Sequence, residues 1–292
     1  MKRGARRPTP GFFTIFRRAL WATYKDGCFG YAKGAAYSAL LSFFPVLTTV
    51  TTLLVQANAE AVSARIAQFL FEVVPPGAGE LVMRNFTMAG GRPIVLPVFA
   101  MALSVWAASG VMMSLMEGFH AAYRVQDKRS FLHKRITSVL LVFAAILPAV
   151  GASALILFGE RAERSLLVAI GLLPAAPAEQ LRGGLLLVGR LARFGISLGT
   201  VVLVTALLYR LGPHCPTSLR NVWPGATLAT SLWLAATLFF GWYVRNIADY
   251  NLLYGSIGAV IALLFWMYVL AVIALIGCAY NAERERQGRH LY

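Results

Sequence analysis

The sequence predicts an all-α polytopic membrane protein with about six transmembrane helices and an N-terminal amphipathic helix. Hydrophobic residues make up 58% of the 292 and charged residues only 13%, with a mean hydropathy of +0.66. A soluble domain usually carries about 25% charged residues, so lipid must cover much of this surface. Six apolar stretches each reach about 20 residues or more, enough to cross ~30 Å of hydrocarbon. They lie near 35–57, 93–116, 136–158, 186–209, 222–244 and 253–280.

The N-terminal segment carries a stripe of large apolar residues at helical spacing. The stripe comprises Phe13, Phe16, Leu20 and Tyr24, flanked by Phe12 and Trp21, whereas Arg17, Arg18 and Lys25 lie off it. This pattern is typical of an amphipathic helix in the membrane interface. A helix packed on the underside of the protein's own membrane domain fits the pattern equally well.

The apolar stretches divide the chain into three parts. Residues 1–34 form a basic cytoplasmic segment with the interfacial helix, 35–281 the six-helix transmembrane domain, and 282–292 a short basic cytoplasmic tail. The outer loops are then about 58–92, 159–185 and 245–252. We expect a surface-lying helix in the first loop and a re-entrant or interfacial segment, SLLVAIGLLP, in the second.

Charge predicts the orientation of the helices. The net charge is +15, from 27 Lys+Arg against 12 Asp+Glu. With both termini inside, 18 of the 27 basic residues fall on the inner side, as the positive-inside rule requires. These basic loops would face anionic lipid headgroups, which accounts for the charge without a nucleic-acid partner.

The first apolar stretch contains a candidate substrate path. Pro45 removes one backbone donor and frees the carbonyl of Leu41, so we expect a kink there. Ser38 and Ser42 lie a turn apart just before it. Spare hydroxyls beside a broken helix suit a substrate or ion path. The alternative is that they only satisfy the freed backbone.

Ionisable residues near the membrane are further candidates. Glu117 ends the second stretch and could pair with Lys33 or Arg124, or bind a cation or proton. Arg190 and Arg193, three residues apart in the fourth stretch, could contact an anionic headgroup or simply anchor the helix. A start of that helix nearer Phe194 would leave both arginines in the interface.

Small residues recur at a spacing of four on two of the stretches. They are Gly110, Ser114 and Gly118 on the second, and Gly195 and Gly199 on the fourth. This spacing lets helix backbones approach closely, so we expect helix packing there. A sliding or gating contact is the alternative.

Motifs for catalysis or metal binding are missing from the sequence. No HExxH, P-loop, CxxC or GxGxxG occurs, and the four histidines and three cysteines have no ligand spacing. We therefore expect no catalytic site, no metal and no cofactor.

Three segments together carry a family resemblance: GAAYSALLSFFPVLT, MEGFHAAYRVQDKRSFLHKR and YGSIGAVIALLFWMYVLAVIALIGCAYNAE. Over roughly residues 10–285 the chain resembles the YihY/BrkB family of bacterial inner-membrane proteins. The resemblance implies six spans, a bacterial plasma (inner) membrane location and cytoplasmic termini. Members have carried the label ribonuclease BN, which the missing metal ligands contradict here. The positions that match the family's motifs are Pro45, Glu117, Tyr254, Gly255 and Trp266, which we add to the candidate path or gating residues.

Two functions follow as hypotheses. The first is a transporter or flippase-like protein for an amphipathic or anionic substrate. The second is a non-transporting membrane scaffold that binds anionic lipid or a partner protein through its basic N-terminal segment. Membrane lipids are the expected partners in both, and a homo-oligomer is left open.

Overall fold

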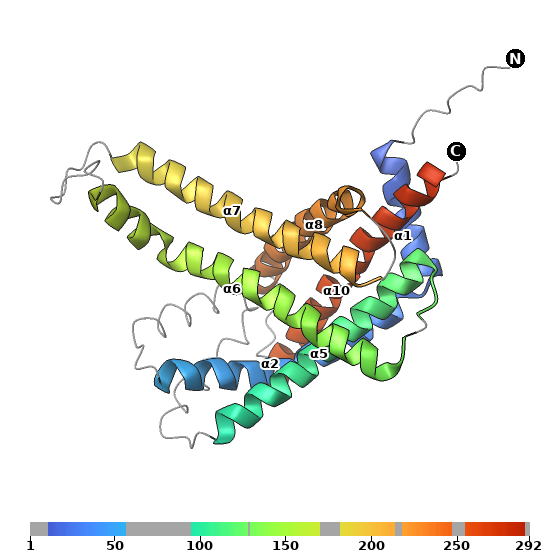
Figure 1. The fold of residues 1–292 in the computed structure, drawn as a ribbon, viewed down its shortest axis with the longest axis horizontal. Coiled ribbons are helices and arrows are strands. Elements are labelled where there is room, and N and C mark those ends of the chain that lie inside the picture. The colour runs from blue at the N-terminus through green and yellow to red at the C-terminus, as the bar shows by residue number, and fades with distance from the viewer. Residues whose placement is uncertain are drawn as a thin grey trace, which may run out of the picture.

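The structure is a computed structural model, and it describes residues 11–56, 95–127, 129–169, 182–213, 218–246 and 255–289 (Figure 1). Every regular element in these ranges is a helix, which confirms the all-α prediction. The helices are α1 (Phe12–Lys25), α2 (Cys28–Gln56), α5 (Val95–Tyr123), α6 (Phe131–Ala169), α7 (Arg182–Leu211), α8 (Leu219–Asn246) and α10 (Gly255–Arg289). Tyr254 and the surface helix expected within 58–92 lie outside the described residues.

The long helices are apolar enough to cross a membrane. Among the described residues, five segments meet this requirement: Val98–Tyr123, Phe131–Ala154, Leu191–Leu211, Leu219–Tyr243 and Val260–Gln287. The 29 residues of α2 span about 43 Å at 1.5 Å per residue, and its Tyr37, Leu41 and Phe44 are exposed. The protein is therefore a multi-pass membrane protein, with α2 as the sixth helix of sufficient length.

Several helices extend beyond the predicted spans. α6 continues to Ala169, so the first part of the predicted outer loop 159–185 is helical. No glycine or proline occurs between 160 and 169, and the residues there include good helix formers. α7 already begins at Arg182, and among its described residues the segment that is apolar enough to span runs from Leu191 to Leu211.

Neighbouring helices run antiparallel and bring their basic ends together. Gly34 on α2 faces Ser114 on α5, and Gly277 on α10 faces Gly225 on α8. Consequently one side of the helix bundle, which we call the basic end, contains α1, the starts of α2, α6 and α8, and the ends of α5, α7 and α10. α1 and the end of α10 lie together there (Figure 1), as an even number of spans requires.

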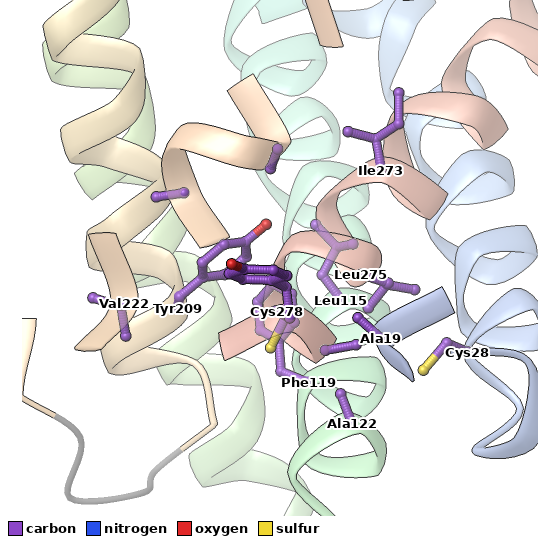
Figure 2. Close-up of a cluster of buried hydrophobic side chains, with 14 of the residues drawn as sticks. Ala19, Cys28, Leu115, Phe119, Ala122, Tyr209, Val222, Ile273, Leu275 and Cys278 are labelled. Carbon is purple, nitrogen blue, oxygen red and sulfur yellow. The ribbon is translucent and has the colours of Figure 1, made fainter. Parts of the chain in front are cut away.

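α10 forms the centre of the main hydrophobic cluster, where it contacts α1, α2, α5 and α8. Figure 2 shows Leu275 and Cys278 of α10 among side chains from the other helices. The Tyr209 hydroxyl of α7 donates a hydrogen bond to the carbonyl of Ala274 at 2.6 Å. The ring of Phe119 meets the Tyr209 ring edge-on, with centroids 5.4 Å apart.

Among the described glycines, those of α8 and α10 make the closest backbone contact between two helices. A Cβ on Gly225 would collide with the carbonyl of Gly277 and with the Asn281 amide. Asn281 is only 2% exposed. Its Oδ1 accepts a hydrogen bond from the Gly225 N–H at 2.7 Å, and its Nδ2 donates to the carbonyl of Val222 at 2.9 Å. Such amide bonds between backbones that approach at glycine are typical of membrane helix packing.

The small residues singled out in the sequence differ in their surroundings. A Cβ on Gly110 would lie 3.0 Å from the Ser38 hydroxyl, and one on Gly118 would collide with Leu275. At Gly195 and Gly199 a Cβ would meet no atom within 4 Å. The predicted packing contact is therefore absent at these two glycines in the part of the chain that the structure describes, because they face away from the neighbouring helices.

The α8–α10 contact leads to a test of stability. We expect Gly225→Ala to destabilise the protein by about 1–3 kcal/mol or more, since the methyl group collides with backbone that cannot give way. The midpoint of thermal unfolding in detergent measures the effect. The matched control, Gly199→Ala, should unfold at or slightly above the wild-type temperature, because alanine favours helix and meets open space. Equal midpoints for the two variants would contradict the contact.

Candidate functional site

α1 is fixed to the basic end through a face of mostly small side chains. Ile15, Ala19, Ala22 and Thr23 are buried, and the helix packs mainly on α10. The Phe12 ring lies 5.6 Å from the Tyr280 ring, which places the start of α1 beside the end of α10. Small side chains allow this close approach.

The apolar stripe predicted on α1 is not the face that packs. Phe13, Leu20 and Tyr24 are exposed, whereas Phe16 is partly buried against the core. Trp21 is 68% exposed, and its ring lies 5.8 Å from that of Tyr24. The two alternatives from the sequence are therefore combined: one face of α1 packs on the protein and another presents aromatic rings outward.

A cavity of about 480 Å³ opens between α1, the residue that follows α5, and α10. Its lining is mostly cationic, and we call it the basic pocket: Arg17, Arg18, Trp21, Ala22, Lys25, Arg124 and Glu283. The sequence pattern marks the basic residues of α1 but does not show that Arg124 and Glu283 lie beside them. These come from positions about 100 and 260 residues further along the chain, and no local pattern links them.

Most of the positive charge in the basic pocket is uncompensated. The Arg124 Nε lies 3.1 Å from Asp26 Oδ1, and Glu283 pairs with Arg286. The remaining cations, Arg17, Arg18 and Lys25, form no ion pair with any described residue. The site is therefore suited to an anion.

Arg124 adopts a strained backbone conformation, with φ of +56°. It ends α5 in the left-handed region, where glycine is the usual residue, and the strain costs about 1–2 kcal/mol. Its backbone N–H donates to the carbonyl of Ala121 at 3.0 Å. Strain of this kind is often stored at functional sites, which supports a role for the basic pocket.

A second polar cluster, the Asp127 clasp, fastens the α5–α6 turn. Arg129 donates to Asp127 through Nε at 2.9 Å and through its backbone N–H at 3.0 Å. Its Nη2 also reaches the carbonyl of Gly212, just after α7, at 3.5 Å. Lys134 and the buried His120 lie 3.6 and 3.7 Å from Asp127. This cluster is not among the sites predicted from the sequence, because its signal there is only a short charged loop between two apolar spans.

Burial alone raises the pKa of Asp127, but the hydrogen bonds from the side chain and backbone of Arg129 outweigh it. They hold the pKa of this carboxyl group well below its usual range. Asp127 is therefore ionised and saturated by its neighbours. No group of three or more His, Cys, Asp or Glu side chains within the described ranges could hold a metal ion.

The predicted path residues of α2 are used within the helix and its packing. The hydroxyl of Ser42 donates to the carbonyl of Ala39 at 2.9 Å, and that of Thr49 to the carbonyl of Pro45 at 2.8 Å. Pro45 itself lies inside a continuous helix. Ser38 faces Gly110 on α5.

The remaining candidates are dispersed. Glu117 is exposed, and it pairs with neither Lys33 nor Arg124, since Arg124 pairs with Asp26 instead. Trp266 stacks on Phe240 in a separate cluster, with centroids 5.2 Å apart. Gly255 is the first residue of α10, and Arg193 is partly buried on α7, while the Arg190 side chain lies outside the described residues.

The Asp127 clasp leads to a second test. We expect Asp127→Asn to destabilise the protein by about 1–3 kcal/mol, because Arg129 loses its charged acceptor. Asp26→Asn, whose partner Arg124 is half exposed, should cost less than about 1 kcal/mol. Since folding lowers the pKa of Asp127, its stabilisation is present above the unfolded pKa of about 3.9 and is lost as the pH falls through the folded pKa. Thermal unfolding between pH 7 and 4 should show a constant difference between wild type and Asp127→Asn; a difference that disappears near pH 6 would contradict this assignment.

Comparison with known proteins identifies relatives along almost the whole chain. The family model described as Virulence factor BrkB matches residues 20–291. The ribonuclease-like protein YfkH of Bacillus subtilis is 32% identical over 258 residues, which cover 87% of this chain and 89% of YfkH.

Larger relatives also match. UPF0761 membrane proteins of Alkalilimnicola ehrlichii and Laribacter hongkongensis are 27% and 28% identical over 88% and 92% of this chain. The chain spans only 55% and 60% of their lengths. No solved structure matches. With the helical architecture and the family match over residues 20–291, this multi-pass membrane protein belongs to the Virulence factor BrkB family.

Proposed function

We propose that the protein binds the headgroup of an anionic amphiphile at its basic end, and that this end faces the cytoplasm of a bacterial inner membrane. The observation that carries the proposal is the position of α1. One face is fixed to α10, the aromatic face is exposed, and the uncompensated cations of the basic pocket lie beside that face.

The physical chemistry of the membrane surface supports this function. Tryptophan and tyrosine favour the headgroup level, where their rings meet lipid and their polar groups meet water. Basic residues near an anionic leaflet each contribute about 1 kcal/mol to membrane attraction. The aromatic face would set the depth of α1, and Arg17 and Arg18 would contact the headgroups. We infer cytoplasmic termini from the same argument, because α1 and the end of α10 both lie at the basic end.

Headgroup binding is common to both functions that the sequence suggested. A scaffold needs nothing more, whereas a transporter also needs a path across the membrane. Pro45 inside α2, one turn from Ser42, is the observation that favours transport as the second candidate. Glu117 lies near the basic end. Along the α2–α5 contact, Ser42 lies about three turns further from that end, a distance of roughly 16 Å at 1.5 Å per residue.

RNA cleavage, which the name of the Bacillus subtilis relative suggests for that protein, is a weaker alternative. The carboxylate in the basic pocket is already paired with Arg286, and lipid headgroups account for the positive charge. Purified protein that shows no salt-sensitive binding of RNA would dispose of this alternative.

The first functional prediction concerns lipid binding. We expect the double variant Arg17→Gln/Arg18→Gln to bind anionic phosphatidylglycerol about tenfold more weakly than wild type, since two headgroup contacts are lost. Native mass spectrometry of the full-length protein with added lipids measures the affinity, with phosphatidylcholine as the neutral reference.

Arg220→Gln is the matched control, because Arg220 is exposed at the basic end but outside the basic pocket. It should bind the lipid as the wild type does. Equal losses in both variants would mean that general charge, rather than this site, attracts the lipid. Unchanged binding in the double variant would overturn the site.

Transport has its own test. In proteoliposomes with fluorescent phosphatidylglycerol, dithionite bleaches only lipid that reaches the outer leaflet. A transporter should make nearly all of this lipid accessible, and Pro45→Ala or Glu117→Gln should slow the exchange at unchanged protein content. Bleaching equal to that of protein-free vesicles would exclude this transport activity and leave the binding function.

A further inference from the structure

Building on the proposed function, we propose that the basic pocket selects a lipid headgroup that combines a phosphodiester with free hydroxyl groups, the chemistry of phosphatidylglycerol. In this arrangement Arg17, Arg18 and Lys25 hold the phosphate, and Glu283 accepts a hydrogen bond from a headgroup hydroxyl. The inference depends on the single carboxylate in an otherwise cationic lining.

The cations match the phosphate. Arg17 and Arg18 present planar guanidinium groups, which bind phosphate oxygens in a bidentate manner, and Lys25 adds a point charge. All three come from one side of α1, a helix whose position is fixed by its packing on α10. The three positions on α1 from which the cations extend are therefore fixed before the lipid arrives.

Glu283 lowers the affinity of the basic pocket for an anion unless that anion also offers a hydrogen-bond donor to the carboxylate. A carboxylate beside a bound phosphate repels it, which lowers the affinity for every anion that offers no hydrogen-bond donor. Its side chain is only 15% exposed, and Arg286 fixes it by pairing with one carboxylate oxygen while donating to the carbonyl of Ala122 at 2.6 Å. A headgroup hydroxyl would satisfy the carboxylate, whereas a headgroup without one would leave it facing the phosphate. A site built to bond a hydroxyl rejects analogues that lack it.

The surroundings favour a lipid over free glycerol phosphate. Trp21 lines the pocket and also belongs to the exposed aromatic face, so the opening lies at headgroup level. Acyl chains could then remain in the bilayer while the headgroup enters the cavity.

The test compares two lipids that share the phosphodiester charge but differ in the headgroup alcohol, of which only one offers free hydroxyls. Phosphatidylmethanol carries the same phosphodiester charge as phosphatidylglycerol but no hydroxyl group. In native mass spectrometry of the full-length protein in detergent, with identical acyl chains, we expect phosphatidylglycerol to bind about five- to tenfold more tightly. Both should bind more tightly than phosphatidylcholine, and free glycerol phosphate should compete weakly.

Glu283→Ala should change the two affinities in opposite directions. Phosphatidylglycerol loses its hydroxyl acceptor, while phosphatidylmethanol gains because the repulsive carboxylate is gone, so the preference disappears. If the alanine variant does not fold, Glu283→Gln retains a neutral acceptor for Arg286 and should show a reduced preference. Wild-type protein with no preference between the two anionic lipids, or a Glu283→Ala variant that keeps it, would overturn the inference. Binding of phosphatidylcholine as tight as that of both anionic lipids would overturn the proposed function as well.

Discussion

The contact between α8 and α10 is the constraint on which the rest of the structure depends. Two glycines let these helices touch at their backbones, and the buried amide of Asn281 bonds to α8 at two points. Because lipid offers no hydrogen-bond partner, such a polar contact is costly to break inside the membrane. It holds the last part of α10 at the centre of the basic end, where α1, α2, α5 and α8 meet it.

The functional surface is built on that central helix. α10 supplies both the platform for the small side chains of α1 and, a half turn after Asn281, the carboxylate Glu283 of the basic pocket. α5 contributes Arg124 from a strained left-handed position at its end. The Asp127 clasp then fixes the following turn to the end of α7. Helix packing thus determines the site, so changes in the core would alter headgroup binding without touching the lipid.

In the proposed site, different groups would attract the protein to an anionic membrane and select one lipid headgroup. On the proposed function, the exposed aromatic rings and the excess positive charge would bring α1 to an anionic surface, a property that many basic amphipathic helices share. Selectivity requires groups from distant parts of the chain at fixed distances, and Glu283 is the group that a simple electrostatic anchor would lack. Opposed charges in one pocket would therefore distinguish recognition of one headgroup, as proposed, from general adhesion to the bilayer.

The sequence by itself determined the helical class, the membrane location and the clustering of basic residues at one end, because these follow from composition and from the length of apolar stretches. It also placed Asn281 in one of the three segments that carry the family resemblance, but it did not show what this residue contacts. Only the tertiary structure decided which small residues pack, since spacing alone does not distinguish Gly118, beside Leu275, from Gly199 in open space. It likewise decided that α1 packs through Ala19 and Ala22 while its aromatic stripe stays exposed. The basic pocket could not be predicted, because its residues are brought together by contacts between helices that are far apart in the chain.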